Sequence, residues 1–227
     1  MSSGEAARIP YSAAFGIPVD RVLALGTPRT DFFFDPVAMA AARERVHALY
    51  PDLAGRRVVL HAPTFRGRGR SKRAATGIDA ARLRAALPAE YILALKTHPN
   101  LDPAATWTAG YDVVIDRSFE INEIFTVTDI LITDFSSSVF EFALLKRPII
   151  VLTDDLEAYE RDPGLYLDPR TELIGAQVSG TDAVAEAILQ DAFDLEPYDA
   201  FIRRHLGACD GSTSDRLVDR FVGADAI

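Results

Sequence analysis

Short apolar runs alternate with segments of helical length along this sequence, and this order constrains the fold more than any other feature. The runs predict strands at 21–25, 57–65, 91–99, 112–116, 129–134 and 147–155. Because strands separated by helices pair in parallel through right-handed crossovers, the pattern predicts a parallel sheet. The runs are rich in Val, Ile and Leu, which is typical of a sheet covered by helices on both faces.

Helical segments are predicted between and after these runs. One helix begins after Asp35, with Pro36 in its first turn, where a missing N–H group costs nothing. Asp79 can cap a second helix, and Ser118 a third. Further helices are predicted at 136–146, 182–191, 198–206 and 213–222. We therefore expect an α/β fold in three parts: a linker segment with the first helix at 1–54, a doubly wound, Rossmann-like parallel sheet at 55–192, and a helical tail at 193–227 that packs on the same domain.

Composition and charge narrow the possible functions. The 227 residues are 48% hydrophobic and 25% charged, so intrinsic disorder is excluded as the main state. Cys209 is the single cysteine, which excludes an internal disulfide and a cysteine-rich metal site and favours a reducing compartment. The net charge of −9 argues against a nucleic-acid partner, whereas five basic residues within 66–73 favour a small anionic ligand.

No segment has the pattern of a targeting signal or a membrane span. Residues 1–10 contain no apolar signal-peptide core, and no window approaches the run of about 18 apolar residues that spans a bilayer. We therefore expect a cytoplasmic protein, with peripheral attachment to the inner face of the membrane left open.

Three polar clusters follow predicted strands, and open α/β sheets bind ligands beyond the carboxyl ends of their strands. In T-D-F-S-S-S-V-F-E (133–141), a strand ends at Asp134 and a helix begins among the serines. Free N–H groups of the first helical turn, together with three hydroxyls, can hold a phosphate or diphosphate. The alternative is an ordinary N-cap, in which one serine pairs with Glu141 in a capping box.

The other two clusters carry a histidine and an arginine. L-K-T-H-P-N places Lys96 and His98 at the end of a strand, and a histidine can bind or protonate a phosphate oxygen near neutral pH. H-A-P-T-F-R-G places Arg66 just past a strand, where it can donate two hydrogen bonds to a phosphate, and Thr64 can add a hydroxyl. The alternatives are a structural histidine and a solvated arginine. His61 lies within the strand and is expected to face the core.

Common cofactor and catalytic motifs are missing from the sequence. It has no G-x-G-x-x-G, Walker A, G-x-S-x-G or H-E-x-x-H motif, so no cofactor is predicted. Asp154 and Asp155 could bind a divalent cation, but adjacent aspartates at a strand end are commonly solvated, and no metal site is predicted.

In their order along the chain, the motifs resemble a known family. G-T-P-R-T-D, V-L-H-A-P-T-F-R, L-K-T-H-P, D-I-L-I-T-D-F-S-S-S-V-F-E-F-A-L-L-K-R-P-I-I and D-G-S-T-S-D-R are similar to the CDP-glycerol glycerophosphotransferases, which make teichoic-acid and capsule-type polymers. The resemblance covers roughly residues 13–222, and 129–148 is its most specific part. It implies the C-terminal half of a GT-B architecture, in which two Rossmann-like domains face each other across a cleft and the donor binds mainly the C-terminal one.

The resemblance also implies roles for individual residues. It places Arg29 in the segment that joins the two domains and Glu141 near the nucleotide sugar. The donor diphosphate is expected to face Arg66, His98, Ser136, Ser137 and Ser138, and the cleft is expected to include Asp210, Gly211 and Ser212. Together with Thr64 and Asp134 from the clusters above, these residues are the candidate donor-binding set, and His98 is the candidate catalytic residue.

The sequence departs from the family pattern in three places. It has no W-H-G-like motif, which in this family carries the catalytic base of the N-terminal domain. We therefore expect the C-terminal half alone, with a partner chain or a further domain supplying the other half. His61 stands where the family usually has an aromatic residue, and Phe135 replaces the commoner tyrosine.

The leading hypothesis is transfer of glycerol phosphate, or a related polyol phosphate, from a CDP-activated donor to a growing polyol-phosphate polymer at the cell surface, with release of CMP. One alternative is a GT-B glycosyltransferase or epimerase half that binds a UDP-sugar. Another is a non-catalytic nucleotide-binding module that has lost its N-terminal domain.

Overall fold

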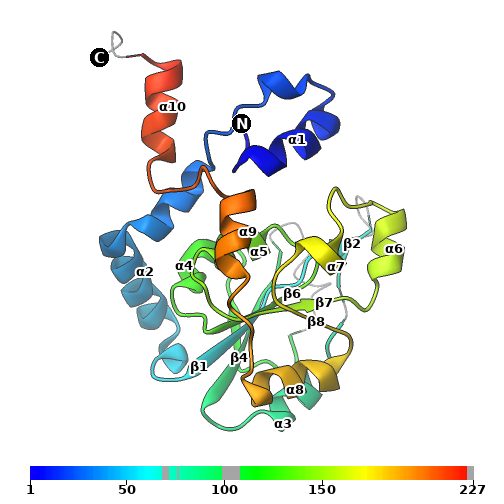
Figure 1. Cartoon of the computed structure of the whole chain (residues 1–227). Coiled ribbons are helices and arrows are strands. Elements are labelled where there is room, and N and C mark those ends of the chain that lie inside the picture. Colours follow the sequence, from blue (N-terminus) through cyan, green and yellow to red (C-terminus); the bar gives the residue numbers. More distant parts are fainter. Residues whose placement is uncertain (68–71, 76, 99–107, 224–227) are drawn as a thin grey trace.

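The structure is a computed structural model that describes residues 1–67, 72–75, 77–98 and 108–223 (Figure 1). Within these residues, six parallel strands form the main sheet in the order β5-β4-β1-β6-β7-β8. Their bounds are Arg57–His61 (β1), Tyr91–Lys96 (β4), Val113–Ile115 (β5), Ile130–Thr133 (β6), Ile149–Leu152 (β7) and Ala176–Val178 (β8). The parallel α/β sheet expected from the sequence is confirmed, and β8 is an edge strand that the pattern did not predict.

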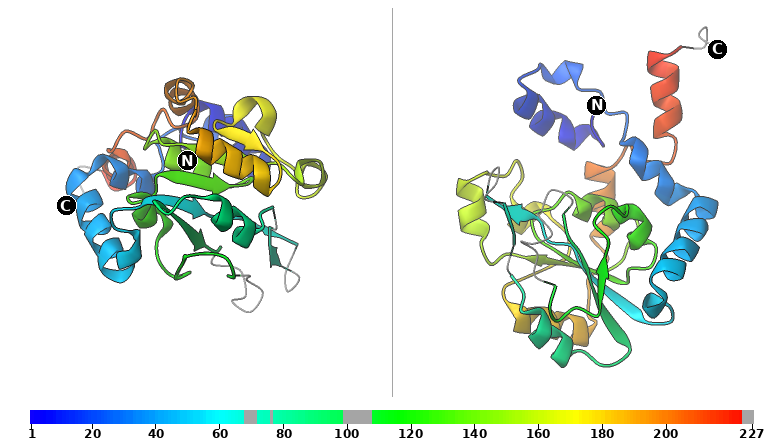
Figure 2. Two further views of the ribbon diagram at one scale, coloured as in Figure 1. Left: turned by 90° about the horizontal axis from the view of Figure 1, so that it is seen from below. Right: turned by 180° about the vertical axis from the view of Figure 1, so that it is seen from behind.

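Helices cover both faces of this sheet (Figure 2). On one face, α3 (Ala80–Ala86) and α8 (Thr181–Gln190) enclose an apolar cluster that includes Val59, Leu93 and Ile150 of the central strands. On the other face, a second cluster is enclosed by α2 (Pro36–Leu49), α4 (Ile121–Phe125), α5 (Ser138–Ala143) and α9 (Tyr198–His205). The shorter elements are α6 (Leu156–Arg161), α7 (Pro169–Glu172), η1 (Glu5–Ala7), η2 (Val19–Arg21), η3 (Pro28–Phe34) and η4 (Pro51–Leu53). The doubly wound arrangement is therefore confirmed.

Carboxylates fix the starts of several elements. Asp79 caps α3 as predicted, since its side chain accepts a hydrogen bond of 3.0 Å from the Arg82 N–H. Asp35 caps α2 in the same way. Asp129 accepts a hydrogen bond of 2.7 Å from the Val58 N–H, which joins the turn before β6 to the start of β1. These bonds satisfy backbone donors that helices and strand ends leave open.

Two local predictions were wrong. Residues 21–25 form no strand; η2 occupies their start, and the Leu23 carbonyl accepts a hydrogen bond from Ser2 instead of pairing with the sheet. The third predicted helix begins at Ile121 rather than at Ser118, whose hydroxyl and N–H both bond to Asp116. The polar loop after β1 contains a short antiparallel pair, β2 (Phe65–Arg66) and β3 (Arg73–Ala74); Arg68 and Arg70 lie outside the described residues.

Both terminal segments lie on one side of the sheet domain, where α1 (Arg8–Phe15) and α10 (Thr213–Phe221) project away from it (Figure 1, Figure 2). The two segments are bonded to each other: the Ala208 N–H donates to the Ser3 carbonyl at 3.1 Å. In the described part of the chain, no helix is both long enough and apolar enough to cross a membrane.

Candidate functional site

A cavity of about 470 Å³ opens at the carboxyl edge of the sheet, beyond β1, β4 and β6. The chain builds the sheet outward in both directions from β1, and open α/β sheets bind ligands at such a switch point. The predicted site residues that line it are Thr64, His98, Ser136, Ser137, Ser138 and Glu141. Arg29, Lys96 and Arg117 also line it, although they were not among the candidates.

Residues 134–138, called the serine loop below, connect β6 to α5 at this cavity. The Ser136 N–H donates to the Asp134 carbonyl at 2.8 Å, which turns the chain sharply after the strand. The Ser136 hydroxyl accepts a hydrogen bond of 3.2 Å from the Ser138 N–H and lies 2.7 Å from the Ser138 hydroxyl. Ser136 therefore has a capping role, whereas Ser137 makes no side-chain cap and lines the cavity. All three serines line the cavity, and Ser136 also bonds to the first turn of α5.

Asp134 lies beneath this loop and ties it to the end of β1. Its carboxylate, 2% exposed, accepts hydrogen bonds from the Thr64 N–H at 2.9 Å and from the Thr64 hydroxyl at 2.6 Å. The Arg66 guanidinium lies 2.8 Å from the same carboxylate. Asp134 thus positions the cavity wall but does not line the cavity itself.

Arg66 does not line the main cavity, although its Nη1 donates a hydrogen bond of 2.7 Å to the Thr64 hydroxyl. Its Nε and Nη2 donate to the two oxygens of Asp155 at 2.6 and 2.9 Å, and its guanidinium lies over the rings of Phe135 and Tyr159. Burial opposes the charged form, but the bonds to Asp155 and the charge of Asp134 raise the pKa of Arg66. Arg66 lines a separate cavity of about 130 Å³, so the structure does not bring it together with His98 and the serines.

His98 follows β4 and lies edge-on to the Phe65 ring, with 4.9 Å between the ring centroids. Burial lowers the pKa of His98, and the positive charges of Lys72 and Lys96 lower it further, against the opposing charge of Asp134. The imidazole is therefore neutral near pH 7 in the free protein, and an anion beside it would favour its protonation.

Glu141 and Arg29 form the rim of the cavity nearest α5. Arg29 Nε lies 3.0 Å from Glu141, and Arg29 Nη2 donates to Glu120 at 2.9 Å. Burial raises the pKa of Glu141, although the charge of Arg29 opposes this shift. Glu141 therefore pairs with an arginine and does not form the capping box that the sequence left open.

Asp210, Gly211 and Ser212 lie outside the lining of this cavity. Asp210 forms an ion pair of 2.7 Å with Arg216, and Gly211, at φ +90°, packs so closely on Phe34 that a Cβ would lie 2.7 Å from that side chain. This turn attaches the start of α10 to η3, the element that carries Arg29. The turn at 210–212 therefore contacts η3 and does not contact the cavity directly.

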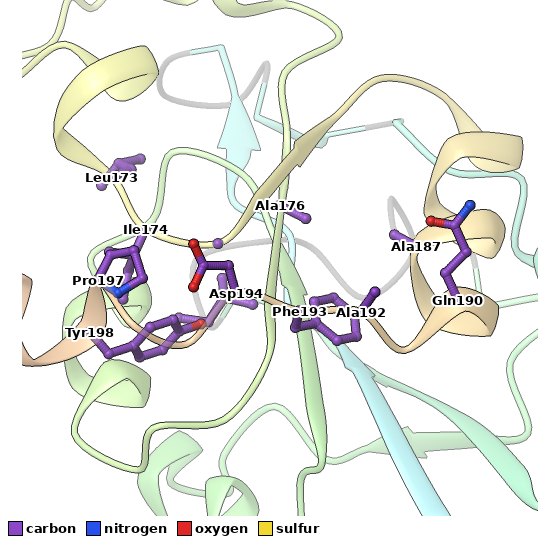
Figure 3. Close-up of a pocket in the computed structure, with 12 residues that line it drawn as sticks. Leu173, Ile174, Ala176, Ala187, Gln190, Ala192, Phe193, Asp194, Pro197 and Tyr198 are labelled. Atoms are coloured by element: carbon purple, nitrogen blue, oxygen red, sulfur yellow. The ribbon is translucent and has the colours of Figure 1, made fainter.

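Another cavity, of about 370 Å³, lies at the opposite edge of the sheet, beside the first residues of β7 and β8 (Figure 3). Its lining is mainly apolar, and Asp194 is its one charged residue among those described. It offers no cation to an anionic ligand. Within the described residues, no group of three or more His, Cys, Asp or Glu side chains could hold a metal ion.

Comparison with known proteins identifies the family. The model of the CDP-glycerol:poly(glycerophosphate) glycerophosphotransferase family matches residues 1–223. The chain belongs to this family. It is 38% identical to the teichoic acid poly(ribitol-phosphate) polymerase of Bacillus spizizenii over 97% of this chain and 36% of that protein. It is 32% identical to the teichoic acid ribitol-phosphate primase of the same organism over 94% of this chain and 56% of that protein.

Solved structures agree with this assignment. A variant of the wall teichoic acid polymerase TagF, soaked with CDPG, superposes with a TM-score of 0.80 and 26% identity over 96% of this chain and 56% of that chain. The UDP-GlcNAc 2-epimerase of Neisseria meningitidis, bound to UDP-GlcNAc, superposes with a TM-score of 0.54 and 17% identity over 96% of this chain, which shows a shared Rossmann-like, GT-B-type fold. The chain thus spans between about a third and just over half of the length of these relatives.

Proposed function

We propose that this chain is the donor-binding half of an enzyme that transfers a polyol phosphate from a CDP-linked donor to a teichoic-acid-type polymer. A hydroxyl oxygen of the acceptor attacks the phosphorus that bears the polyol. A new P–O bond forms, the bridging P–O bond of the diphosphate breaks, and CMP leaves. The observation that carries the proposal is the cavity at the switch point, where His98 meets the serine loop in a chain of this family.

The lining residues suit this chemistry because the charge that develops on the leaving phosphate must be stabilised. Neutral His98 can donate a hydrogen bond to a phosphate oxygen and is protonated more readily once the anion is bound. Ser137 offers a hydroxyl that is not used in a cap, and Thr64 is held in place by Asp134. Glu141 is proposed to lie near the nucleotide sugar, and Arg66 and Asp134 are proposed to support the wall rather than touch the donor.

A second folded body is proposed to complete the site and to supply the base for the acceptor hydroxyl. The surface of α1 and α10 supports this proposal, since Ile9, Phe15 and Phe221 are 72%, 68% and 69% exposed on elements that project to one side. Exposed apolar patches of this kind mark interaction surfaces. Because a CDP-linked donor is a cytoplasmic metabolite, we propose that the reaction takes place in the cytoplasm, at the inner face of the membrane.

Calorimetric titration tests the donor. CDP-glycerol, CDP-ribitol and CDP should each release heat with this chain, and replacement of His98 by alanine should weaken all three. His47→Ala is the matched control, because His47 lies on α2, outside the cavity lining. Absence of heat with every CDP compound, on protein that unfolds cooperatively, would overturn the proposal. A preference for UDP or UDP-GlcNAc would instead favour the UDP-sugar alternative.

CMP release tests turnover and the partner. The purified chain is incubated with CDP-glycerol or CDP-ribitol and a polyol-phosphate acceptor, with and without the remaining part of the Bacillus spizizenii polymerase. We expect release of CMP only in the mixture. Release by the chain alone would contradict the need for a second body, and binding without release in either case would favour a non-catalytic module.

A further inference from the structure

Lys96 is a buried cation at the wall of the cavity. It is the last residue of β4, and the five residues before it in that strand are apolar and buried. Lys96 itself is 4% exposed, and it lines the cavity together with His98. A lysine in such a position is uncommon, because removing an ammonium group from water is costly unless a partner compensates it.

The partners of Lys96 do not compensate its charge. Among the described residues, its Nζ donates one hydrogen bond of 2.8 Å, to the main-chain carbonyl of Arg117. An ammonium group has three N–H donors, and among the described residues no carboxylate forms an ion pair with this one. Burial lowers the pKa of Lys96, and the charges of Asp116 and Glu120 only partly oppose that effect.

Two arginines near the cavity are in the opposite situation. Arg66 pairs with the carboxylates of Asp134 and Asp155. Arg29 pairs with those of Glu120 and Glu141. An anionic ligand therefore gains less from either arginine, because their charges are already matched inside the protein.

We propose that Lys96 is the residue that binds the diphosphate of the donor, in the role that the sequence suggested for Arg66. The inference rests on the proposed function for the identity of the ligand as a nucleoside diphosphate. An anion in this cavity lies beyond the ends of β4 and β6, where both Lys96 and the serine loop line the wall. Binding then supplies the counter-charge that the folded protein lacks at this position.

The charge of Lys96 also acts on His98. Burial is the main cause of the lowered pKa of this imidazole; among the described residues Lys72 and Lys96 lower the pKa further, and Asp134 raises it. When a diphosphate neutralises Lys96, protonation of His98 becomes more favourable. Lys96 thus adds to burial and to Lys72 in favouring the neutral form of His98.

The test is Lys96→Met, with binding measured by calorimetry at pH 7 for CDP, for inorganic pyrophosphate and for cytidine. Affinity for CDP and pyrophosphate should fall about tenfold or more, the usual effect of losing a charge-assisted hydrogen bond. Cytidine, which has no phosphate, should bind as before. Lys146→Met is the control, since Lys146 is an exposed lysine paired with Asp199 and outside the cavity.

The outcomes separate this inference from the proposed function. If the wild-type chain binds UDP and pyrophosphate but not CDP, the proposed CDP-linked donor is wrong. The role of Lys96 is then tested by comparing UDP binding to the wild type and to Lys96→Met. If Lys96→Met binds diphosphates within twofold of the wild type, Lys96 is not their ligand. A purely structural lysine would reduce the affinity for cytidine and pyrophosphate alike and lower the melting temperature. Should the methionine variant fail to fold, Lys96→Gln retains a donor for the Arg117 carbonyl and gives the same readout.

Discussion

His61 makes the stability of this protein sensitive to acid. It ends β1 and is 3% exposed, with its Nδ1 2.6 Å from the Tyr111 hydroxyl and the two rings stacked 5.9 Å apart. Its Nε2 is buried and has no hydrogen-bond partner among the described residues. Burial lowers the pKa of His61 to about 4. The folded chain therefore holds this imidazole neutral, and the expected core-facing position is confirmed.

The size of the effect follows from the two pKa values. In the unfolded chain the pKa of His61 returns to its ordinary value of 6.5. Below that pH the unfolded chain binds a proton that the folded chain excludes, so acid favours unfolding. The contribution of neutral His61 to stability is complete above pH 6.5 and is lost as the pH falls toward 4. The full difference corresponds to roughly 3 kcal/mol, and most of it is lost by pH 4.5.

Urea unfolding at pH 7.5 and pH 4.5 measures the loss in free energy of unfolding. The wild type is compared with a double variant that carries His61→Phe and Tyr111→Phe. The double variant replaces the polar pair by two apolar rings and removes the titrating group. His98 and His205, whose pKa values are also lowered by burial, act in the same direction in both proteins and cancel in the difference. The free energy of unfolding of the wild type should fall by roughly 2–3 kcal/mol more than that of the variant. An equal loss in both proteins would refute the reasoning.

Three further substitutions test the contacts that hold the site in place. Arg66→Met should lower the melting temperature, because it leaves two carboxylates unpaired, while CDP affinity changes by less than about threefold; a loss of affinity without a loss of stability would contradict the positioning role. Asp129→Ala should cost about 1–3 kcal/mol in urea unfolding, because the Val58 N–H loses its acceptor. Arg147→Met should cost about 2 kcal/mol in the same assay, because Nη1 of Arg147 bonds to three main-chain carbonyls at the end of α4, and an unchanged midpoint would show that water replaces them.

The arrangement of the sheet could be predicted because it depends on local pattern. The short apolar run within 129–134 is typical of a strand in a sheet buried on both faces, and it forms β6. β8 was missed because Ala176–Val178 is short, half-buried and contains a glutamine, so it lacks that pattern. Residues 21–25 have the pattern but no neighbouring strand, and their backbone bonds with the N-terminal segment instead.

The site could be predicted in part. The strand order predicts that His98 and the serine loop line the same cavity. They follow β4 and β6, which both flank β1 and end at the same edge of the sheet. The orientation of Arg66 could not be predicted, since it depends on Asp155, which is 89 residues away in the sequence. The burial of Lys96 was equally hidden, because a lysine at a strand end is usually solvated. The contact of Gly211 with Phe34 likewise depends on tertiary packing.

The distribution of charge around the cavity explains how an acidic chain can hold an anion. With a net charge of −9, the protein as a whole does not attract a diphosphate over long distances. The attraction must act at short range, inside the cavity, where water and salt screen it weakly. Arg29 and Arg66 each contact two carboxylates, so they stiffen the walls without adding net charge. Lys96, Arg117 and His98 also line the cavity, and an anion bound beside them favours protonation of His98.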